Sequence, residues 1–391
     1  MINLWNEKDT KNIQNDPLAL RVYSSRLLGS NQSLVLHGGG NTSVKIGKYL
    51  YVKGSGWDLA TIEKEGFPAV SLTTLKEMAT MPSLSDTAMV QGQRDAMKDP
   101  SFPNPSVEAI LHAIIPFDFV DHTHADAVVT LSNTQKGKEI LQEVYGDTML
   151  IIDYIMPGFI LAQKIYEETR AIDWTRLEGI ILLNHGIFTF DDDAHKSYDK
   201  MIAQVSKAEA YLTKHAPINT PKHQSQTQEP QPLQRVAKLL ETLRKSAIDI
   251  QRIDTDQADY FASLPNLHAL LHQGPLTPEH VIRTKAFGMY VEEDAETGLE
   301  QFKKDYLHYF EAYATDEVML DLAPRWIVVQ NRGVYVCGKD TKENKILTDI
   351  ISHTIHAILQ AEALGGWQSL TKDEIFEMEY WELEQAKLKK V

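Results

Sequence analysis

Two histidines separated by a single residue are the first candidates for chemistry in this sequence. They are His122 and His124, in the run Asp121-His122-Thr123-His124-Ala125-Asp126, which is embedded in apolar residues. Residues two apart in a β-strand point to the same face, so the two imidazoles could hold one metal ion between them. The pattern alone is weak, because 14 histidines in 391 residues give about half a His-x-His by chance. Two polar side chains on an exposed strand face are the alternative.

Two further side chains strengthen the interpretation of a metal site. His185 follows an apolar, strand-like run and precedes Gly186, and functional sites are commonly built at the ends of strands in α/β sheets. Glu108 lies in the first turn of a predicted helix, fourteen residues before His122. Three imidazoles with an open fourth position are the ligand set of a catalytic Zn²⁺, and a nearby carboxylate can transfer protons. These residues alone leave open that the histidines are structural.

The first half of the chain supplies the elements that must position these side chains. Apolar residues at helical spacing and β-rich runs between glycines predict helices and strands in alternation. The predicted helices are 16–28, 106–115 and 191–212, and the predicted strands are 33–36, 42–46, 49–53, 120–130 and 179–183. This interleaving predicts an α/β domain, a sheet flanked by helices through about residue 215.

A polar connector divides the chain. Residues 216–234, APINTPKHQSQTQEPQPLQ, are rich in Pro, Gln, Thr and Ser and contain few large apolar residues, which is typical of an exposed linker. The predicted domains are therefore 1–215 and a smaller α/β region over 235–391. In that region we expect helices at 233–243, 340–364 and 380–389 and a strand-like run at 323–337.

The second region contains a weak echo of the first. Asn184-His185-Gly186-Ile187-Phe188 aligns with Asn331-Arg332-Gly333-Val334-Tyr335 at an offset of 147 residues (331 − 184), and each run precedes an aspartate and a long helix. Two unrelated strand–turn–helix units explain the echo equally well. In a degenerate repeat, Arg332 would replace His185 and the second copy should hold no metal.

Other histidines have simpler interpretations. His112 follows Glu108 by four residues, so it could hydrogen-bond Glu108 or simply pack. His268/His272 and His353/His356 have helical spacing, a pattern that can bind metal but is more often a solvated helix face.

Composition excludes several classes of protein. The formal net charge is −15, which argues against a protein that mainly binds nucleic acid or an anionic membrane. The single cysteine, Cys337, excludes an internal disulfide and multi-thiolate metal sites and fits a reducing compartment. The first residues lack a signal-peptide pattern and no apolar run is long enough to span a membrane. We expect a cytoplasmic protein.

The first half resembles the class II aldolase/adducin family, and almost the whole chain resembles the subfamily in which such an aldolase is joined to a dehydrogenase, the rhamnulose-1-phosphate aldolase/lactaldehyde dehydrogenases. The motifs that carry the resemblance are His37-Gly38-Gly39-Gly40-Asn41-Thr42-Ser43, Lys53-Gly54-Ser55-Gly56, Pro105-Ser106-Val107-Glu108, His122-Thr123-His124, Asn184-His185-Gly186, 274–285 and 379–388. The printed sequence ends where that dehydrogenase would begin and contains no Gly-x-Gly-x-x-Gly loop, so we expect no NAD.

The resemblance implies a three-layer sheet flanked by helices, a Zn²⁺ or other divalent metal, and a homo-oligomer, with a tetramer expected by analogy. It implies His122, His124 and His185 as metal ligands and Glu108 as the general acid/base. A substrate phosphate would lie against Gly40, Asn41, Ser55, Gly56 and Ser106, where glycine turns and a helix N-terminus favour anions. Val107 replaces a serine of the family motif, which could shift phosphate contacts to Thr42, Ser43 or Lys53.

The implied reaction is cleavage of a ketose 1-phosphate, such as rhamnulose or fuculose 1-phosphate, into dihydroxyacetone phosphate and a short aldehyde. An epimerase or dehydratase of the same family would use much the same metal ligands. A non-catalytic, adducin-like scaffold is the alternative from a different class, although adducin lacks the metal histidines that are present here.

Overall fold

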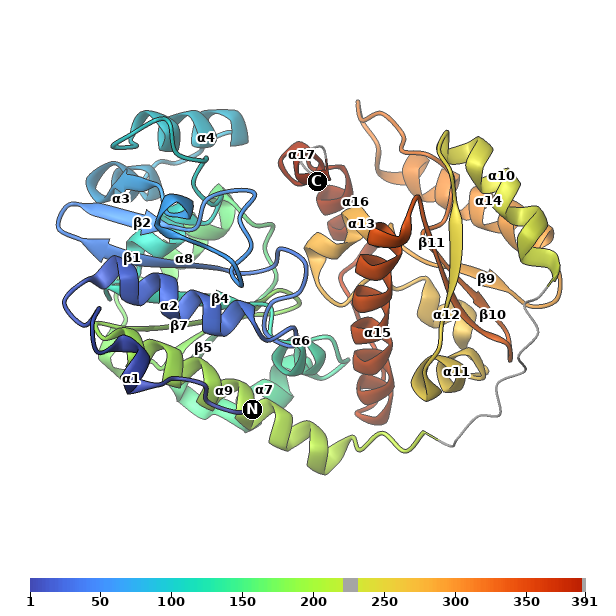
Figure 1. The fold of residues 1–391 in the computed structure, drawn as a ribbon, viewed down its shortest axis with the longest axis horizontal. Coiled ribbons are helices and arrows are strands. Elements are labelled where there is room, and N and C mark those ends of the chain that lie inside the picture. Colours follow the sequence, from blue (N-terminus) through green and yellow to red (C-terminus); the bar gives the residue numbers. More distant parts are fainter. Residues whose placement is uncertain (221–230, 389–391) are drawn as a thin grey trace. The chain divides into compact units, whose positions relative to one another are not determined.

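The computed structural model describes residues 1–220 and 231–388. Residues 221–230 of the predicted connector and Lys389 of the last predicted helix lie outside the described residues. The chain forms two compact units, the first made of Met1–Ser132 and Lys136–Tyr211 and the second of Asn133–Gln135 and the chain from Leu212 onward (Figure 1). Within the described ranges, no helix is long and apolar enough to cross a membrane.

The first unit contains a seven-stranded sheet among its described residues. Its strands are β1 (Asn41–Ile46), β2 (Tyr49–Val52), β3 (Ala69–Ser71), β4 (Phe119–Thr123), β5 (Met149–Ile152), β6 (Gly179–Leu182) and β7 (Gly186–Asp191). Its helices are α1 (Glu7–Thr10), α2 (Pro17–Gly29), α3 (Leu72–Ala79), α4 (Asp86–Asp95), α5 (Ala109–Ile114), α6 (Asp126–Ser132), α7 (Gly137–Tyr145), α8 (Phe159–Thr169) and α9 (Ala194–His215).

Strand order places β4 in the middle of this sheet. The order is β3-β2-β1-β4-β7-β6-β5, and all neighbours are antiparallel except the parallel pair β5 and β6. Helix α2 packs on β1 and β4, and it crosses the front of the sheet in Figure 1. Helix α5 packs on β2 and against α3 and α8. Because β4 is central, every residue of the strand is buried.

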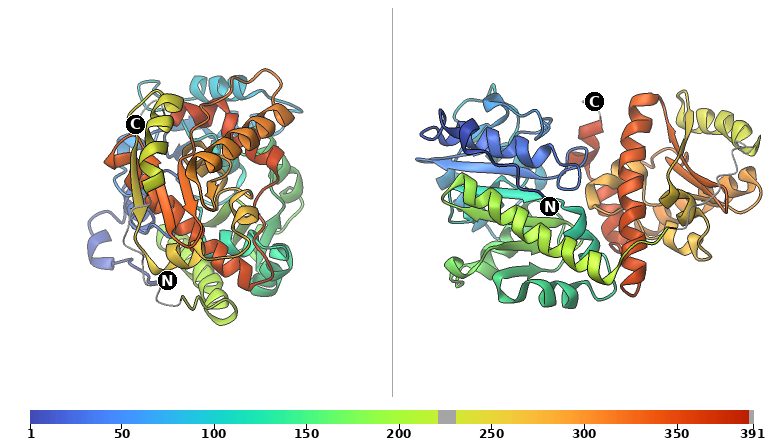
Figure 2. Two further views of the ribbon diagram at one scale, coloured as in Figure 1. Left: turned by 90° about the vertical axis from the view of Figure 1, so that its right-hand side faces the viewer. Right: turned by 60° about the horizontal axis from the view of Figure 1, so that its bottom comes forward.

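The second unit contains a four-stranded sheet in the order β8-β11-β10-β9. Its strands are β8 (Asp249–Ile253), β9 (Met289–Val291), β10 (Trp326–Val329) and β11 (Gly333–Gly338). Its helices are α10 (Gln231–Arg244), α11 (Asp256–Ala262), α12 (Leu267–Leu271), α13 (Val281–Thr284), α14 (Ala295–Tyr313), α15 (Thr341–Ala363), α16 (Lys372–Tyr380) and α17 (Glu382–Leu388). The long α15 runs along β8 and β11, as Figure 2 also shows.

The second sheet repeats the arrangement of half of the first. The order β8-β11-β10-β9 corresponds to β4-β7-β6-β5, with one parallel pair at the same edge of each. The pairs Leu182↔Gly186 and Val329↔Gly333 start equivalent hairpins, and both are offset by 147 residues (329 − 182 and 333 − 186). A long helix follows each hairpin. This shared topology supports the hypothesis of a degenerate repeat.

Several element predictions need correction. Residues 33–36 form no strand, since 33 and 34 lie in a turn and 35 and 36 are irregular. The run 120–130 is strand β4 followed by helix α6, and the run 323–337 is the β10–β11 hairpin. Helix α5 begins at Ala109 and α9 at Ala194, three residues later than predicted in each case. Helix α10 begins at Gln231, so the last residues of the predicted connector are helical. The run 125–131 misleads because a helix buried on all sides has the same apolar pattern as a buried strand.

Candidate metal and catalytic site

Strand β4 and the residues directly after it position the first two histidines. His122 lies within β4, paired with Asn41 of β1 and Phe188 of β7, and is fully buried. His124 follows the strand and is partly buried. The Nε2 atoms of the two rings are 3.0 Å apart. Both nitrogens therefore approach one point.

The third histidine comes from the turn between β6 and β7. Asn184, directly before His185, has a φ of 57°, a left-handed conformation that asparagine tolerates better than most residues. Its backbone N–H donates to Ser132 Oγ at 3.0 Å. One ring nitrogen from each of His122, His124 and His185 lies within 4.8 Å of the others. The structure thus brings together the three histidines that the sequence singles out.

The donor set fits a divalent metal. The three rings are turned 64°, 89° and 76° to one another in pairs, so their nitrogens converge without the rings stacking. His122 Nδ1 donates to the backbone carbonyl of Ile187 at 3.1 Å, which leaves Nε2 as the ligand atom. Metal-binding histidines commonly donate their other ring N–H in this way.

Gly186 has no side chain, which leaves room for the rings of His122 and His124. A Cβ at this position would lie 2.5 Å from the Thr123 carbonyl oxygen and 3.0 Å from ring atoms of His122 and His124. We expect Gly186→Ala to lower the free energy of unfolding by about 1–3 kcal/mol, as overpacked cores do, and to weaken metal binding. Gly92→Ala is the control, because its Cβ would meet only the flexible end of Met78. Chemical denaturation and metal titration measure both effects, and equal behaviour of the two variants would contradict this explanation.

Glu108 is the acidic group of the site. It directly precedes helix α5 and is 5% exposed. Its Oε2 is 3.6 Å from His122 Nε2 and its Oε1 is 3.7 Å from His185 Nε2. Oε1 is buried and has no hydrogen-bond partner. A buried carboxylate oxygen without a hydrogen bond lowers the stability of the fold. The position of such an oxygen beside the imidazoles therefore favours a functional role for Glu108.

A chain of hydrogen bonds, which sequence reasoning missed, orients this carboxylate. Asn41 Nδ2 donates to Glu108 Oε2 at 2.5 Å, and Asn41 Oδ1 accepts from His112 Nε2. Burial lowers the pKa of His112 well below its ordinary value, so the ring is neutral and its Nδ1 accepts from Ser43 Oγ at 2.8 Å. The four-residue spacing of Glu108 and His112 is the one sequence signal for this chain.

A buried ion pair lies on the opposite face of the same strands. Arg21 of α2 pairs with Asp121 of β4, and both side chains are fully buried. Asp121 also accepts from Ser197 of α9 at 2.6 Å. Asp121 and Thr42 face α2, whereas their neighbours His122, Asn41 and Ser43 face the histidine cluster, because side chains alternate along a strand. The ion pair thus holds β4 on the face that points away from the histidine cluster.

The predicted phosphate contacts lie in three segments, two of which are neighbours. Ser55 donates its N–H to Asn104 O at 2.8 Å and Ser106 donates to Lys53 O at 3.0 Å, so the Ser55-Gly56 turn lies beside Ser106. Gly40 and Asn41 lie at the start of β1, where the side chain of Asn41 is engaged with Glu108. Two of the three alternative contacts fit less well, because the Thr42 hydroxyl bonds Ser25 and the Ser43 hydroxyl bonds His112.

The second sheet, which the repeat hypothesis compares with the first, has different residues at the three ligand positions. Ile253 pairs with Val334 as Thr123 pairs with Ile187, so His122 and His124 correspond to Arg252 and Asp254, and His185 corresponds to Arg332. Arg252 donates to Asp254 at 2.7 Å. Two arginines and one aspartate do not form a metal ligand set, which agrees with a degenerate copy.

Comparison with known families identifies the family to which this fold belongs. The family described as "Class II Aldolase and Adducin N-terminal domain" matches residues 20–212. The family described as "Aldolase class II, second domain" matches residues 227–388. The chain therefore belongs to the class II aldolase/adducin family.

Individual relatives cover different parts of the chain. A curated protein of Bacillus subtilis (strain 168), named "Uncharacterized oxidoreductase YuxG", is 29% identical over 398 residues, covering 94% of this chain and 57% of that protein. The N-terminal class II aldolase domain of a conserved protein from Thermoplasma acidophilum is 37% identical, with a TM-score of 0.50, covering 54% of this chain and 99% of that one. An L-fuculose-1-phosphate aldolase from Thermus thermophilus is 17% identical, with a TM-score of 0.35, covering 51% of this chain and 95% of that one.

Proposed function

We propose that this protein is a metal-dependent aldolase that cleaves a ketose 1-phosphate into dihydroxyacetone phosphate and a short aldehyde. The observation that carries the proposal is the buried carboxylate of Glu108, 3.6 and 3.7 Å from two imidazoles of a three-histidine cluster. A His₃ set leaves the full double charge of a divalent metal for substrate, and the adjacent carboxylate can move a proton. Membership of the class II aldolase/adducin family supports the same reaction.

In this proposal His122, His124 and His185 hold the metal, with Zn²⁺ as the expected ion. When bound, the metal would supply stabilisation of negative charge on the substrate oxygens. Glu108 takes up the hydroxyl proton that the substrate releases as the aldehyde forms and gives a proton to the carbon at which the carbon–carbon bond has broken; both transfers reverse in the condensation direction. Asn41 holds Glu108 Oε2 by a hydrogen bond of 2.5 Å, which keeps the partnerless Oε1 directed at the substrate.

Substrate phosphate would lie against Gly40, Asn41, Ser55, Gly56 and Ser106. In this proposal Asn41 contributes its backbone, because its side-chain amide already contacts Glu108 and His112. The proposal includes a homo-oligomer, tetrameric by analogy, which light scattering would test. It includes no NAD-dependent step, so mixing the chain with released aldehyde and NAD⁺ should give no NADH.

Metal content and product identity test the proposal together. The purified protein, incubated with rhamnulose 1-phosphate or fuculose 1-phosphate, should release dihydroxyacetone phosphate, measured by a coupled assay. Chelation should abolish release and Zn²⁺ should restore it. His185→Ala should bind one metal equivalent fewer than the wild type, whereas the control His195→Ala should bind the same number. An epimerised or dehydrated product would indicate the alternative chemistries, and a first unit that binds no Zn²⁺ would indicate a scaffold.

A further inference from the structure

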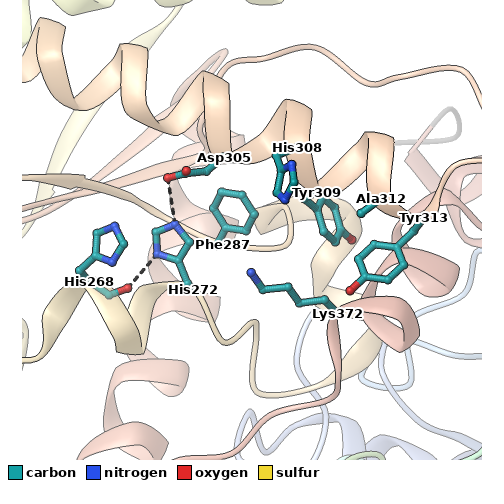
Figure 3. A pocket seen from close by; sticks show the side chains of 9 residues that line it. All are labelled: His268, His272, Phe287, Asp305, His308, Tyr309, Ala312, Tyr313 and Lys372. Carbon is teal, nitrogen blue, oxygen red and sulfur yellow. Dashed lines mark hydrogen bonds and ion pairs between the residues drawn. The ribbon is translucent and has the colours of Figure 1, made fainter.

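A second cluster of metal-binding side chains lies in the second unit, outside the site described above. His268 comes from α12, His272 follows that helix, and Asp305 comes from α14. One donor atom from each lies within 4.8 Å of the others, and Figure 3 shows the His272 ring between His268 and Asp305. Helical spacing favours a solvated face for the two histidines, but the His272 side chain is only 18% exposed.

The hydrogen bonds of His272 determine which of its nitrogens faces the aspartate. Nδ1 lies 2.8 Å from the backbone carbonyl of His268, so Nδ1 donates its proton there and Nε2 faces Asp305. Nε2 and Asp305 Oδ2 are 3.3 Å apart, longer than the roughly 2.7–2.9 Å of a charge-assisted hydrogen bond. Ligands about 2.0–2.1 Å from one ion are about 2.8–3.0 Å apart in octahedral geometry and about 3.3–3.4 Å apart in tetrahedral geometry. The separation therefore suits two ligands of one ion.

Neighbouring groups hold two of the candidate ligands, His272 and Asp305, in place. Gln301 Nε2 donates to Asp305 Oδ1 at 2.9 Å, which turns Oδ2 toward His272. The His272 ring stacks on Phe287 at 4.8 Å and on His268 at 4.3 Å. Such outer contacts orient ligands and raise metal affinity. His268 is exposed, so a change of its rotamer to complete the set costs little.

The cluster opens onto two cavities, of which the larger is suited to a cation; Lys372 lines the smaller one. Their volumes are about 450 and 560 Å³, and His268, His272 and Asp305 line both. Among the described residues that line the larger cavity are four carboxylates and no lysine or arginine; the carboxylates are Glu292, Glu293, Asp294 and Asp305. Negative charge in a cleft raises the local concentration of cations. The cavities leave space for water or a small ligand in the remaining coordination positions.

We propose that His268, His272 and Asp305 bind a divalent transition-metal ion, such as Zn²⁺, with open positions toward the cavities. Two imidazoles and one carboxylate suit Zn²⁺, Co²⁺, Mn²⁺ or Fe²⁺ rather than Ca²⁺ or Mg²⁺. The site is independent of the histidine cluster in the first unit and uses none of the repeat positions Arg252, Asp254 and Arg332.

Titration of the full chain with Co²⁺, by calorimetry and visible absorption, tests the proposal. His268→Ala/His272→Ala should bind one equivalent fewer than the wild type, while the matched pair His353→Ala/His356→Ala, at helical spacing on α15, should bind as the wild type does. Because the comparison is with the wild type, failure of the first unit to bind metal would not affect this result. An unchanged number of equivalents in the first variant would overturn the proposal.

Two milder variants cover the case in which the double variant does not fold. His268→Ala changes an exposed side chain, and circular dichroism should report an unchanged fold. Loss of this ligand should weaken the site at least about 10–100-fold, since loss of an outer-shell partner alone costs that much. Asp305→Asn should have a similar effect. Wild-type affinity in both variants would also refute the proposal.

Discussion

Glu108→Gln should retain the metal of the first unit and lose most turnover, about 10²–10⁴-fold in kcat, which is the usual contribution of general acid–base catalysis. Glutamine has the shape of glutamate, and its side-chain oxygen can still accept from Asn41, which is 2.5 Å from Glu108 in the wild type. It cannot take up a proton at neutral pH. Elemental analysis and the assay for dihydroxyacetone phosphate would measure the two properties separately.

Glu77→Gln is the matched control, because Glu77 is an exposed glutamate of α3 in the same unit. This variant should turn over at the wild-type rate. Wild-type turnover by Glu108→Gln would exclude Glu108 as the acid/base. Loss of metal together with activity would instead indicate that the carboxylate acts as a ligand.

Arg21→Met should have the largest effect on stability. It leaves Asp121 as a fully buried charge without its cation, and breaking a buried ion pair in this way costs about 3–5 kcal/mol. Asp121 is the neighbour of His122 in the central strand, so metal affinity should fall as well. Urea unfolding of the full chain, followed by circular dichroism, would measure the loss.

Two further variants distinguish the cost of a buried unpaired charge from the cost of losing an arginine side chain. Arg26→Met removes an arginine from the same helix, but its ion pair with Glu63 is exposed, so the cost should stay within about 1 kcal/mol. Arg21→Met/Asp121→Leu removes both charges and should recover much of the loss, because a buried pair can be replaced by apolar residues at little cost. Equal destabilisation by Arg21→Met and Arg26→Met would contradict the role given to the buried pair.

The family and the α/β class could be predicted from local motifs. Short runs such as Asn184-His185-Gly186 combine a residue type with a backbone requirement. Asn184 has a left-handed backbone conformation, and a Cβ on the residue at position 186 would collide with Thr123. Three helices of the first unit, α2, α5 and α9, were also predicted from the sequence, whereas the other helices were not. Element ends and the helix after His124 were not, because a fully buried segment shows no periodic contrast between a polar and an apolar face.

The sequence by itself determined which side chains could do chemistry: three histidines and one glutamate in family motifs. It predicted His122 and His124 on one face of a strand, whereas β4 ends at Thr123 and His124 follows it. Only the tertiary structure decided what surrounds them. Asn41 reaches Glu108, His112 reaches Asn41, and Arg21 reaches Asp121, through contacts between residues about 70 to 100 positions apart. Strand order and pairing register create these contacts, and both depend on how whole elements pack. The spacing of residues within one strand, by contrast, indicates only which side chains share a face of that strand.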